Sequence, residues 1–464
     1  MTPTVDSTAK SHPIKEAPFP FHRAGKRKPK GFLLVQEWLL RRTGFLPLGD
    51  ETLVPSRFLK CTSRAMAWMA MAFLVTNALY NFTTILRVFR KVASPNLDGQ
   101  PVLAVNEGQE HWLHSLLYFL PDLTATGRGL PVLATMYYKR NRWAGLKQRA
   151  IEFVAYCFTD PNAESRLYRK MKLLSVGSCF ITIVLYILWV SCAWTEAVQG
   201  LVANNDSLSY LEIQFYPFPI HLSLVQRIVL DSVFTIFPYI LSQQAQLCGV
   251  FLVIILSEGL TRLREEIIRE RGNLGALTTE RVHRWVMIHA RMMELVDEIG
   301  ETFQVIFLLS YVLDFLNVIG SSAVFLNANM ITSYWSYIYY TATFCMFGLY
   351  ATALAYPLIQ VVEKSATLPD ALYLLTLTLE DHKQNQPTSE RDSSKEISKR
   401  LRQFELSCRN HPLIFTGLKY VYFTRELLTP DVDVDSVLYD SGERAPQMNK
   451  VNRITRSDQS SSFT

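Results

Sequence analysis

The chain has 464 residues, of which 49% are hydrophobic, 12% aromatic and only 19% charged. Soluble globular proteins carry about 25% charged residues, so the composition favours a protein that lies in lipid. The formal net charge of +6 is too small to indicate a nucleic-acid partner, and no Lys/Arg run accompanies a nucleic-acid-binding motif. The apolar residues gather into long blocks with the charges between them, which predicts an all-α membrane protein.

Six apolar blocks are long enough to cross a bilayer as helices, which takes about 20 residues. The second block is interrupted by Pro121, Asp122 and Arg128, and the fourth contains a polar run that begins at Ser242 and ends at Gln246. Together they form a predicted transmembrane bundle over 65–359. The predicted spans are residues 65–86, 112–138, 172–195, 228–257, 303–326 and 334–359.

The positions of Lys and Arg predict a cytosolic amino terminus. These residues are frequent before the first span, in the loop 139–171 and in the loop 258–302, whereas 196–226 and 327–333 contain none. Loops that are rich in Lys and Arg stay on the cytosolic side of a membrane. The alternation therefore predicts a multi-pass membrane protein with a basic cytosolic segment at 1–64, which also places the bare loops outside the cell.

The bare loop 196–226 carries Asn205-Asp206-Ser207, an acceptor motif for N-glycosylation. Because we place this loop outside the cell, we expect Asn205 to be the modified residue. The seven cysteines show no CxxC spacing, and none lies in a segment that we place outside. We therefore expect buried free thiols rather than a disulfide framework or a zinc site.

The cytosolic segments after the fourth span contain helical patterns of apolar residues. Apolar residues in 258–302 recur at helical spacing, which predicts two long cytosolic extensions of the fourth and fifth spans that pack on each other. The cytosolic loop 360–410 contains a charged stretch, 379–407, that is typical of a helix or a disordered link. Residues 411–428 are apolar but too short and too charged to cross a bilayer, so we assign them to a truncated seventh segment. Residues 429–464 form a polar tail.

Polar side chains within apolar spans are costly, so they indicate either contacts between helices or a functional site. Asp314 and Asn317 lie one turn apart on one face of their span, and both interpretations stay open for them. For the glutamine run of the fourth span, helix–helix contacts are favoured. Asp122 and Arg128 are two turns apart, and we assign no role to that pair.

The sixth span opens with a cluster of aromatic residues that includes Trp335 and Tyr339, and Trp189 and Trp194 lie near the outer end of the third span. Such rings form an aromatic belt at the membrane interface or stack on a ligand. Together with the polar residues of the fifth span they would form an outward-facing cup, whose composition is typical of a small-molecule pocket. The predicted ligand-binding residues are Asp314, Asn317, Trp335, Tyr339 and Trp194.

No catalytic pattern is present: the sequence lacks GxSxG, HExxH, Walker A and dinucleotide-binding glycine motifs. His111 and His114 are one turn apart, but no second pair of Cys or His follows at the spacing of a metal site. We therefore expect neither an enzyme nor a cofactor or metal.

Two stretches resemble the gustatory receptor family of arthropods. FTGLKYVYFTRELL, from Phe415 to Leu428, resembles the first part of that family's last span. IHARMMELVDEIGETFQVIFLLSYVLDFLN, from Ile288 to Asn317, is similar to its passage from the second cytosolic loop into the fifth span. The resemblance implies a taste receptor of the plasma membrane that binds a sugar or a bitter compound in an outward-facing pocket within the bundle of spans two to six. It also implies a ligand-gated cation channel that assembles as a homo- or hetero-tetramer, in contact with membrane lipid.

The sequence departs from this family at the pore. The family's last span continues into a pore-lining helix that ends in a Thr-Tyr and Gln-Phe signature, whereas Leu428 here is followed by Thr429-Pro430-Asp431. Three alternatives follow: a truncated isoform, a misjoined gene model, or a subunit that binds ligand without lining a pore. A secondary transporter of a small solute is the other candidate function, because the second and fourth spans are interrupted.

Overall fold

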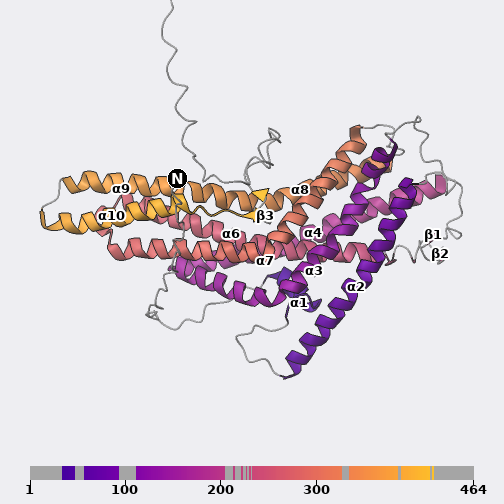
Figure 1. Ribbon diagram of the computed structural model, residues 1–464, viewed down its shortest axis with the longest axis horizontal. Coiled ribbons are helices and arrows are strands. Elements are labelled where there is room, and N and C mark those ends of the chain that lie inside the picture. The colour runs from indigo at the N-terminus through magenta and orange to yellow at the C-terminus, as the bar shows by residue number, and fades with distance from the viewer. Residues whose placement is uncertain are drawn as a thin grey trace, which may run out of the picture.

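A computed structural model of the chain is helical almost throughout (Figure 1). The structure describes residues 34–47, 57–93, 111–203, 213–214, 221–222, 226, 229–230, 232–326, 334–384, 388–417 and 421–422. Asn205 and the tail 429–464 lie outside these residues.

The described helices follow in chain order. They are α1 (Val35–Arg42), α2 (Arg57–Ala93), α3 (His111–Cys157), α4 (Pro161–Ala203), the π-helical turn η1 (Ser232–Ile236), α6 (Phe237–Arg271), the 3₁₀ turn η2 (Leu274–Ala276), α7 (Thr279–Leu326), α8 (Tyr334–Ala366), α9 (Leu368–Gln384) and α10 (Thr388–Asn410). Two antiparallel pairs of very short strands complete the description: β1 (Ile213–Gln214) with β2 (His221–Leu222), and β3 (Thr416–Gly417) with β4 (Val421–Tyr422).

Five of the described helices are long and apolar enough to cross a membrane. They are Cys61–Thr83, Pro161–Cys192, Ser232–Arg271, Thr279–Leu326 and Tyr334–His382. They overlap every predicted span except 112–138. That segment lies on α3, which runs as one helix through Pro121 and Asp122 but is not among the five. A sixth span therefore stays a prediction.

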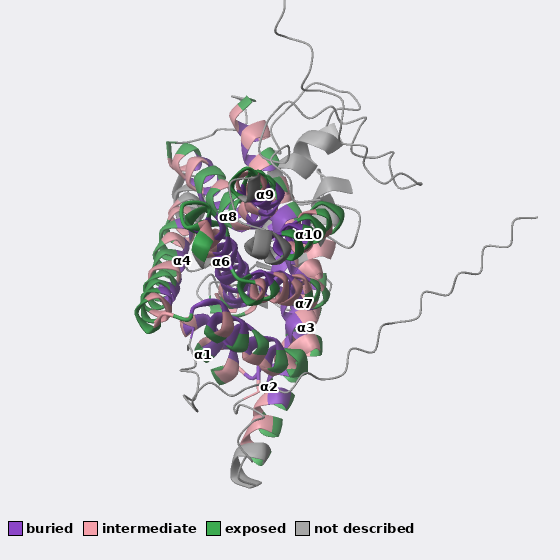
Figure 2. Ribbon diagram, turned by 90° about the vertical axis from the view of Figure 1, so that its left-hand side faces the viewer, coloured by how far each residue is buried: buried purple, intermediate pink, exposed green. Residues whose placement is uncertain are grey.

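Helix α6 lies at the centre of the molecule, as Figure 2 shows. In its apolar stretch 83% of the residues are buried by the protein, compared with 28% in α4. α4 instead exposes a row of large apolar side chains that includes Leu173, Phe180 and Ile187. A helix that is apolar on every side is either enclosed by other helices or faces lipid. α6 is the enclosed helix, and α4 is the helix that faces lipid.

Helices α6, α7, α9 and α10 continue beyond the other helices as an elongated bundle (Figure 1). We call it the arm and define it as residues 258–302 together with α9 and α10. The two extensions expected in 258–302 are present and pack together: Arg281 pairs with Glu270, and Arg284 Nη1 lies 3.3 Å from Glu266 Oε1. The charged stretch 379–407 is helical wherever the structure describes it.

The basic segment before the first span contains a helix that sequence inspection did not predict. α1 lies against α4 and α6, and Leu34 just before it and Leu40 within it are buried. Its Glu37, fully buried, accepts hydrogen bonds from Arg41 (2.7 Å) and Lys147 (3.0 Å). The chain then turns at Gly44, whose φ of 82° suits glycine.

The segment 411–428 was assigned to a truncated seventh segment. Its described residues leave α10 in extended form, with Leu413 N donating to Ser365 Oγ at 3.0 Å. They end in the β3–β4 pair, whose β3 strand packs against α7. The described part of this segment is therefore not helical.

Close packing between α6 and α7 depends on one glycine. A methyl group added at Gly249 would lie 2.6 Å from Phe307 Cζ and 2.7 Å from Phe303 Cδ1, and both rings are buried. We expect Gly249→Ala to lower the free energy of unfolding by about 1 to 3 kcal/mol through overpacking. Gly300→Ala on α7 is the matched control, because nothing lies within 4 Å of its added methyl group. Thermal unfolding of the detergent-purified variants measures both effects, and equal melting temperatures for the two would contradict the expectation.

The arm contains a buried histidine between α7 and α10. His289 is 2% exposed and its ring contacts Phe404 edge-to-face at 5.7 Å. Burial, and secondarily the charge of His411, lowers the pKa of His289 from 6.5 to about 4. A histidine that stays neutral when folded contributes its full stability above pH 6.5, and this stability is lost as the pH falls towards 4.

We therefore expect the arm to lose stability between pH 6.5 and 4, by on the order of 3 kcal/mol at most. His289→Met removes the titrating group and should flatten the decline of melting temperature over this range. His283→Met, exposed on the same helix, should leave the decline unchanged. An identical pH profile for parent and His289→Met would show that His289 is not responsible.

Candidate functional site

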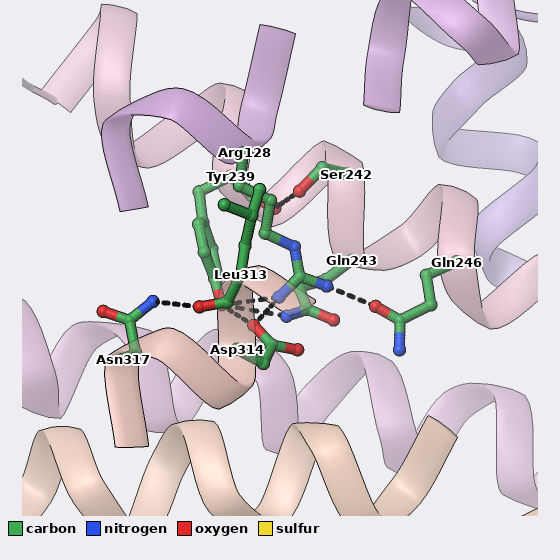
Figure 3. Close-up of polar contacts among 8 residues, drawn as sticks. All are labelled: Arg128, Tyr239, Ser242, Gln243, Gln246, Leu313, Asp314 and Asn317. Carbon is green, nitrogen blue, oxygen red and sulfur yellow. Dashed lines mark hydrogen bonds and ion pairs between the residues drawn. The ribbon is translucent and has the colours of Figure 1, made fainter. Parts of the chain in front are cut away.

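An ion pair lies within the apolar part of the bundle. Arg128 of α3 pairs with Asp314 of α7 through Nη1 and Oδ1, and both side chains are fully buried. Figure 3 shows the guanidinium pointing from α3 towards α7. Isolated charges in an apolar interior are very costly, so a buried charge needs a partner. Each of these two groups supplies that partner to the other.

Helix α6 contributes the remaining partners of Arg128. Its Nη2 donates to Gln246 Oε1, and its Nη1 donates to the hydroxyl of Tyr239 at 3.1 Å. The guanidinium carbon also lies 5.0 Å from the centre of the Tyr239 ring, which is a cation–π distance. Gln243 Nε2 donates to the same hydroxyl at 3.0 Å. Arg128 and its three partners, Asp314, Gln246 and Tyr239, thus join α3, α6 and α7.

Aromatic rings extend from this ion pair to the other side of the bundle. The Tyr239 ring lies 5.0 Å from that of Tyr186, Tyr186 lies 5.4 Å from Trp189, and Trp189 stacks on Tyr339 at 6.0 Å. Trp189 is fixed in place because its Nε1 donates to Thr343 Oγ1 at 2.9 Å. The rings come from α4, α6 and α8, and all four are less than 9% exposed. We refer to Arg128, Asp314, Gln246, Tyr239, Tyr186, Trp189 and Tyr339 as the core cluster.

Residues 129–429 match the family profile described as 7tm chemosensory receptor. The chain belongs to this family. Its members are multi-pass membrane receptors, so the chain is a receptor rather than an enzyme, as the sequence predicted. The match extends through 411–428, the segment that carried part of the resemblance. No curated protein sequence matches the chain.

Solved structures of an insect olfactory receptor have the same fold. The chain is similar to olfactory receptor OR5 from Machilis hrabei in complex with eugenol, with a TM-score of 0.62 and 14% identity over 85% of this chain and 92% of that one. A second structure of the same receptor gives a TM-score of 0.53 at the same identity and coverage. At this identity the comparison shows the fold of the chemosensory receptor family and nothing about its ligand.

The structure brings together only some of the predicted ligand-binding residues. Asp314 and Tyr339 belong to the core cluster, at its two ends. Asn317 is buried one turn after Asp314, and its Nδ2 donates to the carbonyl of Leu313 at 2.9 Å. Trp335 is half-buried and lies 6.1 Å from the ring of Tyr334, and Trp194 is half-buried on α4. Within the described residues, the ring contacts of the core cluster do not include these two tryptophans.

Sequence inspection missed the partner of Asp314. Arg128 was compared only with Asp122, two turns away on the same helix, although any cation in an apolar span needs a countercharge. The described spans contain Asp314 as such a countercharge. The predicted spans also contain Asp122 and Asp231, so the sequence alone narrows the countercharge of Arg128 to three aspartates and the structure identifies Asp314. Tyr186 and Tyr239 offered no comparable signal, because tyrosines are frequent in this chain.

The ion pair leads to a stability prediction. Asp314→Asn leaves Arg128 buried without a countercharge, which costs about 3 to 5 kcal/mol. The double variant Arg128→Met/Asp314→Leu removes both charges and should melt at a higher temperature than Asp314→Asn. As control, Glu301→Gln breaks the exposed 2.6 Å pair with Arg142 and should cost about 1 kcal/mol or less. A double variant that melts no higher than Asp314→Asn would contradict the coupling.

Proposed function

We propose that this chemosensory receptor is a taste receptor subunit of the plasma membrane with its amino terminus in the cytosol. It binds a small tastant in a pocket at the core cluster that opens outwards, and it gates a cation channel as a homo- or hetero-tetramer. Besides Asp314 and Tyr339 of the core cluster, the ligand-binding residues are Trp335, Trp194 and Asn317. Asn205 is the glycosylation site.

One observation carries the proposal: aromatic rings run without a break from Tyr339 to a buried ion pair. Aromatic faces bind apolar or cationic parts of a ligand, and buried polar groups fix its orientation. In a membrane bundle, rings alone would suit a wholly apolar ligand. The ion pair and the amides beside it favour a molecule with hydrogen-bonding groups, which supports a water-soluble tastant over an apolar odorant.

Two further features support the orientation. The arm carries most of the charged residues between spans and is too polar to lie in lipid, so the bundle presents it to the cytosol under the positive-inside rule. The arm also provides an extended helical surface on which other subunits could pack. A tetramer whose other subunits line the pore is consistent with the sequence after Leu428.

Electrophysiology in a heterologous cell tests the proposal. The chain is expressed alone and together with a family member that has the complete last span, and a panel of sugars and bitter compounds is applied. We expect a tastant-evoked cation current that depends on this chain. Uptake of a labelled solute without any evoked current would instead establish the transporter.

Variants of the core cluster connect the current to the site. Trp189→Phe removes the hydrogen bond to Thr343, worth about 1 kcal/mol, and should raise the half-maximal tastant concentration about fivefold. Trp68→Phe is the matched control, because Trp68 is 75% exposed on α2. Surface expression is measured for each variant. A shift of equal size in the control would place the ligand elsewhere.

A further inference from the structure

One buried face of α7 changes its chemistry part-way along the helix. Towards the arm this face is apolar and includes Phe303, Ile306 and Phe307. From the middle onwards four of the seven buried positions are polar, namely Ser310, Asp314, Asn317 and Ser321, and the other three are Tyr311, Gly320 and Val324. The spacing of four, three and four residues places these side chains on one side of the helix. We call the four residues the polar face; it extends about 16 Å at about 1.5 Å per residue.

Each residue of the polar face holds a buried polar atom that no other described group satisfies. Ser310 Oγ, Asp314 Oδ2, Asn317 Oδ1 and Ser321 Oγ have no hydrogen-bond partner within the described part of the chain. All four residues are 0% exposed. Two neighbouring helices add to this set, with Arg128 Nε on α3 and both amide atoms of Gln244 on α6.

Unsatisfied polar atoms are rare in folded proteins and are especially costly within a bilayer. One isolated atom can be tolerated, but four on consecutive turns of one face indicate that something satisfies them together. Water or the hydroxyl groups of a solute do so, because each supplies both donors and acceptors. Hydrogen bonds between helices, the other role of such residues in a membrane, do not account for these four atoms, because none of them has a partner among the described residues.

The polar face ends at an aromatic layer. Phe303 and Phe307 stack on each other at 5.7 Å, and Trp143 of α3 meets Phe303 edge-to-face at 6.0 Å. Gly249 of α6 lies directly against both phenylalanine rings. All three rings are at most 2% exposed. This layer closes the bundle between the polar face and the arm.

We propose that the polar face lines a water-accessible path that enters from the Leu326 end of α7, passes Ser321 and Asn317, reaches the ion pair at Asp314, and stops at the aromatic layer. Polar solutes use this path to reach the core cluster without crossing lipid. A path with one closed end suits a receptor, whereas a transporter needs access from both sides. The inference rests on the proposed function for one point, that the Leu326 end of α7 faces outwards.

Cysteine accessibility in intact cells tests this path. Ser310→Cys, Ser321→Cys and Ile306→Cys are introduced singly into the full-length chain. A membrane-impermeant cationic methanethiosulfonate is applied from outside, and peptide mapping by mass spectrometry measures the labelling rate at each new thiol. The controls are Phe315→Cys and Ile319→Cys, which lie at similar depths of α7 but are 47% and 41% exposed on its outer surface.

We expect Ser321→Cys and Ser310→Cys to be labelled about tenfold faster than the controls or more, because only a hydrated thiol ionises and reacts. Ile306→Cys, beyond Ser310 and level with the aromatic layer, should react as slowly as the controls. Serine and cysteine are nearly isosteric, so the two serine variants should fold as the parent does. Labelling rates are compared only among chains that reach the cell surface. If Ser310→Cys fails to reach the surface, the rate at Ser321→Cys decides.

Two results would overturn the inference. Labelling of Ser321→Cys no faster than Ile319→Cys would mean that the polar face is dry, and fast labelling of Ile306→Cys would mean that the aromatic layer does not close the path. The assay needs no tastant and no current. A chain that is labelled as expected but gives no evoked current therefore contradicts the proposed function alone.

Discussion

The ion pair between Arg128 and Asp314 determines how the centre of this bundle is organised. A charge enclosed by apolar helices must be compensated where it lies, so α3 and α7 have to meet at these two residues. Tyr239 and Gln246 of α6 complete the coordination of the guanidinium. Because α6 is enclosed on every side, the position of the pair also sets the position of α6. The aromatic rings of α4 and α8 then pack on Tyr239, and the five helices share one polar centre.

The two halves of α7 show how one helix serves two environments. Near the arm its buried face is apolar, its exposed face is charged, and Arg149 pairs with Glu298 across the boundary with α3. Farther along, the exposed face carries Phe315 and Ile319 while the buried face is polar. The second half is thus the reverse of a water-soluble helix, as expected where lipid lies outside and polar groups lie inside.

Much of this fold could be predicted from the sequence, because long apolar blocks and the alternation of positive loops are local properties of the chain. The spans that contain α6, α7 and α8 were found in this way, as were the paired extensions of the arm. α1 was not, since its eight residues have no apolar block and are held by tertiary contacts of Glu37. The site was predicted in part for a similar reason. Asp314 is conspicuous in its span, but which rings surround it depends on helix packing, and Trp335 and Tyr339 look alike in sequence although only the second contacts Trp189.

Helix α3 is held at two charged points. Near one end Lys147 binds the carboxylate of Glu37, and nineteen residues earlier Arg128 binds Asp314. At about 1.5 Å per residue these points are about 28 Å apart along a single helix. Because α3 is one continuous helix, a translation or rotation that disturbs one ion pair also disturbs the other. The short helix α1 is thereby connected through α3 to the ion pair at the centre of the bundle. A displacement of α1 therefore also displaces Arg128, and a displacement of Arg128 also displaces α1.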